Sequence, residues 1–183
     1  MKKLFSVTKL AASLFGVRGL NLKRREKTLH GHKLLELTDE QLFETVYLQN
    51  VDLVYSYPDE DTAFQQIKSE YRIVFTVSVF DMEIQNGGLC QFFVNSPETL
   101  ASHVNEYLKI VGAEEHQKLF ADFVRENHID LNNLQSFRIS DIEEFSQQSE
   151  RYDFEVFDKA YSELPPLTYY ITKYIKANIS TFQ

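Results

Sequence analysis

Cysteine is nearly absent from this sequence, and the single residue, Cys90, can form no disulfide within the chain. One thiol also cannot build a multi-cysteine zinc site, so the disulfide-rich and zinc-ribbon classes of protein are both excluded. This cysteine usage is typical of a reducing compartment, and we therefore predict a cytoplasmic protein. Long hydrophobic runs are missing too, because no stretch of about 18 apolar residues is uninterrupted. We therefore predict that the chain has no membrane-spanning helix.

Glycine and proline are also scarce, with six and four residues among 183, which excludes collagen-like and low-complexity chains. Hydrophobic residues make up 43% of the chain and charged residues 25%, the composition of a globular protein with a core. The length is typical of a single domain. Helical spacing of apolar residues recurs and convincing alternation does not, so we predict an all-α, single-domain bundle of about six to eight helices.

Positive charge is scarce beyond the first 33 residues. The whole chain has 19 Lys and Arg against 27 Asp and Glu, a formal net charge of −8. Residues 1–33 contain nine basic residues and one acid, whereas residues 34–183 contain ten basic residues and 26 acids. We therefore divide the chain into a basic N-terminal arm and linker, 1–33, and an anionic helical domain, 34–183. Such a domain repels nucleic acid and attracts basic partners.

The basic arm does not fit a signal peptide, because Lys9 interrupts its apolar region and Arg18 lies where cleavage would be expected. Its apolar residues recur at helical spacing, which favours an amphipathic helix that packs on the domain, with contact to a membrane surface as the alternative. A further interpretation is that the arm folds against its own acidic domain and hides that surface until a partner displaces it.

Capping signals divide the anionic domain into helices. Thr38 and Gln41 form a capping box that opens a helix over about 38–56. The acidic run after Pro58 suits the beginning of a second, long helix that continues to about Ile84.

The Asn-Gly-Gly sequence at 86–88 should stop that long helix, because glycine adopts a left-handed conformation without steric cost. A short helix is expected directly after it. Ser96 as N-cap and Pro97 at the first helical position predict a further helix that Gly112 ends, and 113–127 should form the next one.

A second capping box, formed by Ser140 and Glu143, opens an acidic helical stretch to about Leu164, with a break near Ser149 as one alternative. The prolines at 165–166 should end that stretch and begin the last helix. An apolar stripe of this helix should face inward: Tyr170, Ile171, Tyr174 and Ile175.

The segment 83–95, with two adjacent glycines between polar amides, is the most distinctive in the chain. Adjacent glycines can turn backbone N–H groups toward an anion, but the spacing matches neither the Walker loop nor the dinucleotide fingerprint. We favour a tight helix-to-helix corner in which Glu83, Gln91 and Asn95 pair with open backbone groups. An enzyme that uses this corner as an anion site is the least favoured class of function.

Candidates for metal binding and nucleophilic catalysis are weak. His30 and His32 are two closely spaced imidazoles without a third ligand at a metal-site spacing. Cys90 has no histidine at a recognisable spacing, so a buried hydrophobic role suits it better than that of a nucleophile. We therefore predict no metal, no cofactor and no enzymatic activity.

The densest negative charge lies between Asp141 and Asp158, where seven acids accompany one base, Arg151. A continuous helix with about 1.5 Å of rise per residue would carry roughly one net charge per 4.5 Å, near the ~3.4 Å between phosphates of one DNA strand. The carboxylates of such a helix share one arc: Glu143, Glu144, Glu150, Glu155 and Asp158. The apolar residues should lie opposite: Ile142, Phe145, Tyr152 and Val156. An ordinary solvated helix surface is the alternative.

Several blocks of residues resemble the DNA mimic protein family over roughly 38–183. The most specific block, E-x-x-N-G-G-x-x-Q-F-F-x-N, contains Glu83, Asn86, Gly87, Gly88, Gln91, Phe92, Phe93 and Asn95. Weaker blocks follow in the same order: Leu108 to Ala113, Phe157-Asp158 with Tyr161, and Tyr174 to Phe182. Leu89 stands where this family usually has an aromatic residue. The resemblance implies an all-helical fold, frequent dimerisation and an acidic surface that imitates duplex DNA.

Charge and resemblance together favour an acidic protein that occupies a DNA-binding protein or nuclease. We predict a partner-binding surface made by Glu143, Glu144, Glu150 and Glu155, with Asp59, Glu60 and Asp61 as a second group. The motif residues and Asp158 are interpreted as structural. A homodimer is one expectation, and the acidic domain should not bind nucleic acid itself. The main alternative is an immunity-type or other interaction module that binds through an apolar helical face.

Overall fold

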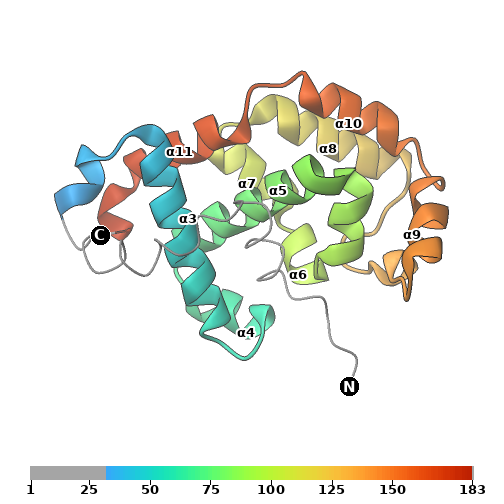
Figure 1. Cartoon of the computed structure of the whole chain (residues 1–183), viewed down its shortest axis with the longest axis horizontal. Helices are drawn as coiled ribbons and strands as arrows, with labels where there is room; N and C mark the ends of the chain where they lie inside the picture. Colours follow the sequence, from blue (N-terminus) through green and yellow to red (C-terminus); the bar gives the residue numbers. More distant parts are fainter. Residues whose placement is uncertain (1–31, 183) are drawn as a thin grey trace.

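The computed structural model of the protein describes residues 32–182. Nine α-helices and short 3-10 turns make up this range, which contains no strand (Figure 1). The predicted all-α class is therefore confirmed. The predicted basic arm lies outside the described residues, apart from the backbone of its last two positions, where the 3-10 turn η2 (His32–Glu36) begins.

The helix α3 (Asp39–Tyr55) begins as the sequence predicts. The Gln41 N–H donates to the Thr38 hydroxyl at 3.3 Å, and the Thr38 N–H donates to the Gln41 side chain at 3.2 Å. This reciprocal pair is a complete capping box, which satisfies two backbone donors that a helix beginning leaves open. The buried face of α3 carries Leu42, Val46, Tyr47, Asn50 and Val54.

The long helix expected from Pro58 to Ile84 is divided in two, so that prediction is wrong in its continuity. The helix α4 (Glu60–Gln66) begins at the N-cap Asp59 and ends at Ile67, whose backbone is extended. A second helix, α5 (Ser69–Asn95), begins two residues later. The apolar spacing continues across the break because Phe64 and Ile67 are buried in the same core as α5, and periodicity alone does not show such a break.

The end of α5 leads into two short helices, α6 (Glu98–Ala101) and α7 (Val104–Val111). The predicted cap at Ser96 is wrong: Pro97 takes the N-cap position, and Ser96 is buried with an unpaired hydroxyl. The predicted end at Gly112 is confirmed, since its φ of 84° is left-handed. The helix α8 (Glu114–Glu126) follows at once.

The acidic stretch forms two helices, α9 (Ile142–Ser149) and α10 (Phe154–Ser162), with the break near Ser149 that the sequence allowed. The predicted capping box of Ser140 and Glu143 is wrong, because the helix is capped one residue later and its acidic side chain pairs with the residue before the cap. Asp141 is the N-cap and accepts from the Glu144 N–H at 2.9 Å, while the Glu144 carboxylate accepts from the Ser140 N–H at 2.6 Å. The last helix is α11 (Leu167–Ala177), followed by the 3-10 turn η4 (Ile179–Thr181).

The helix α5 runs through the middle of the molecule, in contact with α3, α7, α10 and α11 (Figure 1). Interlocking aromatic rings fill the core around it, and Phe80 contacts Phe92 and Phe120 with ring centroids 5.0 and 5.2 Å apart. The helix α9 lies at one end of the molecule, away from α3 and α4 (Figure 1). It buries none of its residues completely, and most of its side chains face solvent, where an external partner can reach them.

Candidate functional site

A sharp corner in α5 is built by the two adjacent glycines. Gly87 (φ −158°, ψ 22°) and Gly88 (φ 78°, ψ 179°) leave helical geometry, and the helix resumes directly afterwards. The next N–H, that of Leu89, donates to Asp158 Oδ1 of α10 at 2.9 Å. A Cβ on Gly88 would lie 2.2 Å from Asp158 Oδ2, so a side chain is sterically excluded there as well as strained.

Glu83 holds the two halves of α5 together across this corner. Its Oε2 accepts from Gln91 Nε2 and from Asn95 Nδ2, both at 2.8 Å, and the Glu83 side chain is 2% exposed. A Cβ on Gly87 would collide with Gln91 Oε1, which explains why this position is a glycine. Glu83, Gln91 and Asn95 therefore form one bonded unit through their side chains, and the expectation that they pair with open backbone groups is wrong.

The carboxyl groups of the corner have raised pKa values. Burial raises the pKa of Glu83, and the bonds from Asn95 and Gln91 oppose this shift in part. Burial also raises the pKa of Asp158, against the smaller effect of the Leu89 N–H. Lost hydration disfavours the charged carboxylate, whereas donated hydrogen bonds favour it.

The groups of the corner have a structural role, because they hold neighbouring helices together. Asp158 already occupies the position next to the Leu89 N–H that an external anion would need. Cys90 is buried, and burial raises the pKa of its thiol to about 11, which keeps it protonated and unreactive at neutral pH. Phe92 and Phe93, each less than 2% exposed, anchor the second half of α5 in the aromatic core.

The four carboxylates that the sequence favours for partner binding are all exposed and lie on or beside α9 and α10. Glu143 and Glu144 belong to the first turn of α9, Glu150 is its C-cap, and Glu155 belongs to the first turn of α10. None of the four forms an ion pair with another described residue. We call these four residues the end surface.

The second acidic group lies elsewhere, on α4, and the structure does not bring it to the end surface (Figure 1). Asp59 caps α4 through the Thr62 N–H at 2.7 Å, a bond that lowers the pKa of this carboxyl. Glu60 is half-buried, and burial with the neighbouring Asp61 raises its pKa. Asp61 accepts a hydrogen bond from the Thr99 hydroxyl. These three acids are engaged in local structure.

Two apolar residues near the end surface do not lie where a continuous helix would place them. Ile142 is 86% exposed and Val156 is 69% exposed, so these two residues share the solvent with the carboxylates and the predicted separation of an apolar face from an acidic face is wrong. Phe145 and Tyr152 do pack against the core. The cause is the break at 150–153, which resets the phase of the helix and removes the continuous arc of carboxylates.

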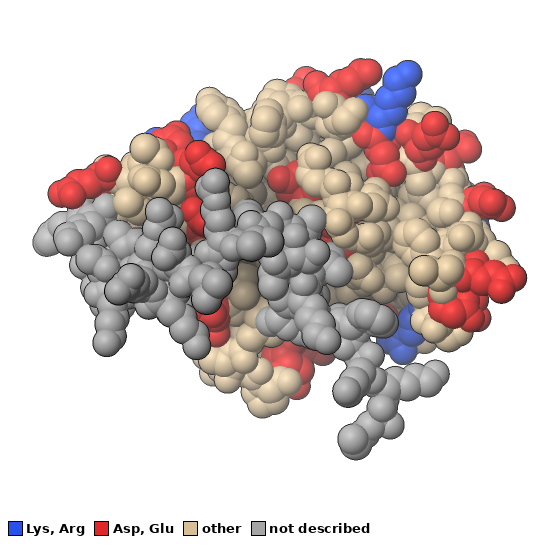
Figure 2. All heavy atoms as spheres, in the orientation of Figure 1, with Lys and Arg blue, Asp and Glu red and all other residues tan. Residues whose placement is uncertain are grey.

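Acidic side chains lie at several places on the face that Figure 2 shows, and one group of them follows an edge of the molecule. In Figure 2, red atoms of acidic residues follow the rim on the right of the view, where Figure 1 places α9 and α10. Tan surface separates the red groups, and few blue atoms interrupt them. The negative charge of this end is therefore a discontinuous rim, in which other residues separate the acidic groups.

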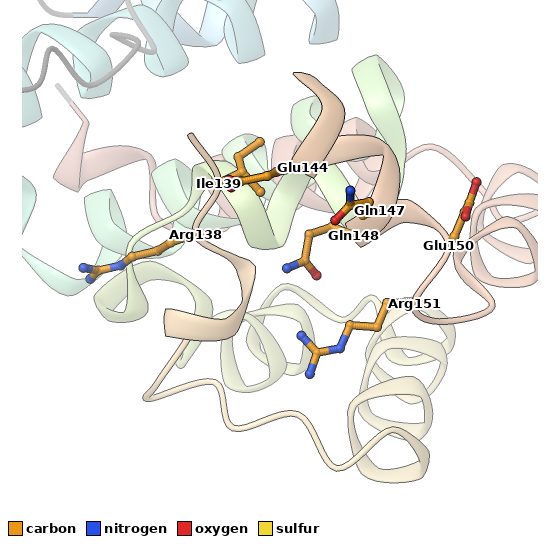
Figure 3. Close-up of a pocket in the computed structure, with 7 residues that line it drawn as sticks. All are labelled: Arg138, Ile139, Glu144, Gln147, Gln148, Glu150 and Arg151. Atoms are coloured by element: carbon orange, nitrogen blue, oxygen red, sulfur yellow. The ribbon is translucent and has the colours of Figure 1, made fainter. Parts of the chain in front are cut away.

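A cleft of about 520 Å³ beside α9 is a feature that the sequence analysis missed (Figure 3). Arg138 and Arg151 are the two basic residues of its lining, and Figure 3 shows the Arg138 side chain directed away from Gln148 and Arg151. Arg138 lies in the loop between α8 and α9, and no spacing rule in the sequence predicts that this loop borders the cleft. Two arginines 13 positions apart carry no recognisable motif.

Two further classes of site were sought in the described part of the chain. Residues 32–182 contain no group of three or more His, Cys, Asp or Glu residues arranged to hold a metal ion. Within the same range, no helix is long and apolar enough to cross a membrane. His30, one of the two imidazoles considered above, lies outside the described residues.

Fold and surface together define an all-helical protein with an acidic rim at one end. More specifically, the chain belongs to the DMP19-like protein family, whose model matches residues 65–178, more than half of the chain. This match corrects the resemblance to the DNA mimic protein family over 38–183, because the family that matches is a different one and the match is shorter. No curated protein and no solved structure matches the chain.

Proposed function

We propose that the protein binds a basic surface of a DNA-binding protein or nuclease, with the carboxylates of the end surface in place of duplex phosphates. The observation that carries this proposal is the presence of four exposed carboxylates, without ion-pair partners in the described part, on two consecutive helices. Like charges held at an exposed edge attract a basic partner over a Debye length of about 8–10 Å. Steep weakening by salt follows from this mechanism.

A second candidate function rests on the exposed apolar residues of the same end. Ile142 and Val156 present large hydrophobic side chains to solvent. Such residues suit an interface whose energy comes from apolar burial, with the carboxylates as a polar border. In that case the protein is an interaction module that resembles duplex DNA only in charge, and its binding depends weakly on salt.

The first experiment is affinity capture from a host lysate at low and high salt, with added duplex DNA as a competitor. For phosphate imitation, a basic protein should be retained at low salt and released by duplex DNA. The variant E143Q/E150Q/E155Q should lose this retention. Glu144 stays unchanged in it, because its carboxylate caps α9.

The matched control is E36Q/E40Q/D52N, which removes the same charge from exposed positions on η2 and α3. These elements lie away from α9 (Figure 1), so the control should retain the partner. Equal losses in both variants would contradict a specific end surface. Retention that survives salt and duplex DNA, and that is lost in I142S/V156S, would favour the apolar interface.

The compartment, the oligomeric state and the arm belong to the same proposal. The single buried thiol supports a reducing compartment, such as the cytoplasm. We expect the acidic domain to bind protein and not nucleic acid, and we expect sedimentation to reveal a homodimer. If the basic arm covers the end surface, a chain without residues 1–33 should bind the partner more tightly, whereas unchanged affinity would dismiss this autoinhibition.

A further inference from the structure

Asn86 lies at the corner of α5 but takes no part in the side-chain bonds that hold the corner. Glu83 accepts its hydrogen bonds from Gln91 and Asn95, and the Asn86 side chain is not involved in them. Residues 85–87 are exposed to solvent, although much of α5 is buried. Water therefore has access to the Asn86 amide, and the bonds of the corner give this side chain no role.

Asn86 is also the one asparagine of the sequence that a glycine follows. The carbonyl carbon of an asparagine side chain, Cγ, can be attacked by the backbone nitrogen of the next residue. A side chain on that next residue hinders the approach, whereas glycine has no Cβ and adopts the required backbone conformations easily. Gly87 is thus the neighbour that most favours this attack.

The helical backbone at Asn86 opposes the attack. Within α5 only Gly87 and Gly88 depart from helical dihedral angles, so Asn86 itself keeps them. Closure of a ring between Cγ and the Gly87 nitrogen requires ψ of Asn86 to rotate away from the helical value of about −42°. Such a rotation displaces the second half of α5, which the bonds to Glu83 fix. The attack therefore needs local opening of the corner.

We propose that Asn86 is a site of spontaneous deamidation, and that the closed corner holds this reaction back. The Gly87 nitrogen forms a bond to Asn86 Cγ, the bond from Cγ to Nδ2 breaks, and the Gly87 N–H proton leaves with Nδ2 as ammonia. Water then adds to one of the two carbonyls of the resulting cyclic imide and opens it to aspartate or isoaspartate. No electrons are exchanged with another reactant. The proposal is independent of the proposed partner binding.

Either product changes the corner permanently. Both place a carboxylate where a neutral amide was, which adds one negative charge to the formal net charge of −8. Isoaspartate also leads the main chain through the former side-chain carbon, so the backbone becomes one atom longer. The corner has no room for added atoms, because a Cβ on Gly87 would collide with Gln91 and one on Gly88 with Asp158. A transient opening of the corner is thereby converted into a lasting one.

The test follows deamidation in the full chain at neutral pH, by the mass gain of the peptide that contains Asn86 and by enzymatic methylation of isoaspartate. The reaction should be about tenfold or more faster in guanidinium chloride than in the folded wild type, since unfolding removes the helical restraint. Gly88→Ala crowds the corner and leaves the Asn86–Gly87 pair intact. In the folded variant the reaction should be about tenfold or more faster than in the wild type, whereas the two denatured chains should react equally.

Two controls separate the corner from general effects. Gly112→Ala, where the added Cβ meets no atom within 4 Å, should accelerate the reaction at Asn86 much less than Gly88→Ala. Asn132 is exposed in the loop after α8, and its own conversion should not respond to Gly88→Ala.

Three results would overturn the proposal. Absence of a mass gain at Asn86 in the denatured chain would reject the site, and equal rates in the folded and denatured wild type would reject the protection by the corner. An equal rate in the wild type and in folded Gly88→Ala would also reject that protection. Should Gly88→Ala fail to fold, Glu83→Ala replaces it, because that variant removes both side-chain bonds of the corner and keeps the reacting pair.

Discussion

The Asn-Gly-Gly corner and the helix α9 stand in contrast. In the corner, Glu83 is buried and Asp158 is half-buried, and they accept hydrogen bonds at 2.8–2.9 Å. In α9 no residue is buried, and the acidic side chains project into solvent. Both segments lie within the family match, but the corner constrains the fold, whereas the surface of α9 can change its charges without disturbing the core. The family motif is thus informative about architecture, and the end surface about the partner.

The sharpest test of this contrast is Gly88→Ala. The new Cβ would meet the Asp158 carboxylate in a left-handed conformation, so we expect a loss of about 2–4 kcal/mol in the free energy of unfolding. Gly112→Ala is the matched control: its φ is 84°, but no atom lies within 4 Å of the added Cβ. It should cost only about 1 kcal/mol. Urea denaturation measures both, and equal losses would show that the Asp158 contact is unimportant.

A second, smaller effect is expected for Glu83→Ala. Removing the acceptor leaves the Gln91 and Asn95 amide donors without their partner, at a cost of about 2 kcal/mol. Glu83→Gln keeps an oxygen acceptor and should lose less than about 1 kcal/mol at pH 5. Thermal and urea unfolding provide the comparison. Similar losses in the two variants would mean that the acceptor bonds contribute little.

The pH dependence of stability separates the charge of Glu83 from its hydrogen bonds. Its pKa is raised in the folded state, so the folded chain binds this proton more tightly than the unfolded chain does. The resulting stability is fully present below the unfolded pKa of about 4.3 and is lost as pH rises through the raised folded pKa. The advantage of the wild type over Glu83→Gln should therefore shrink with rising pH. An advantage that grows with pH would contradict the raised pKa.

His116 contributes to the pH profile with the opposite sign. Burial lowers the pKa of His116, so its contribution is present above the unfolded pKa of about 6.5 and is lost as pH falls. Both proteins in the Glu83→Gln comparison contain His116. The difference between their unfolding free energies at each pH therefore isolates Glu83.

The smallest effect on stability is expected at the end surface. E143Q/E150Q/E155Q changes exposed side chains that form no ion pair within the described part, so the free energy of unfolding should stay within about 0.5 kcal/mol of the wild type. The same variant should lose the salt-sensitive partner. A large loss of stability here would remove the contrast between the corner and α9.

Much of the fold could be predicted because the signals are local. The capping box of Thr38, the left-handed end at Gly112 and the break at Gly87 and Gly88 each depend on residues a few positions apart. The prediction that Ser96 caps a helix is wrong because this residue is buried at the end of α5. The favourable Ser-Pro pair in the sequence does not reveal that burial.

The candidate site was less predictable, since its geometry depends on contacts between distant segments. The exposure of Ile142 and Val156 follows from the break between α9 and α10, and a helical wheel assumes that no such break exists. The Arg138–Arg151 cleft needs the loop after α8 to return along α9. Charge density along the sequence therefore located the acidic end and not the arrangement of groups on it.

The bond from Leu89 to Asp158 also has a consequence for the order of folding. It joins positions 69 residues apart, and the Tyr71 hydroxyl donates to the Thr181 carbonyl over 110 residues. During synthesis, the central helix α5 is made long before either acceptor exists. Until α10 and the C-terminal turn arrive, the glycine corner lacks its partner and aromatic side chains of α5 remain without cover. Folding of this protein should thus be completed late and cooperatively, when the last quarter of the chain packs against the core.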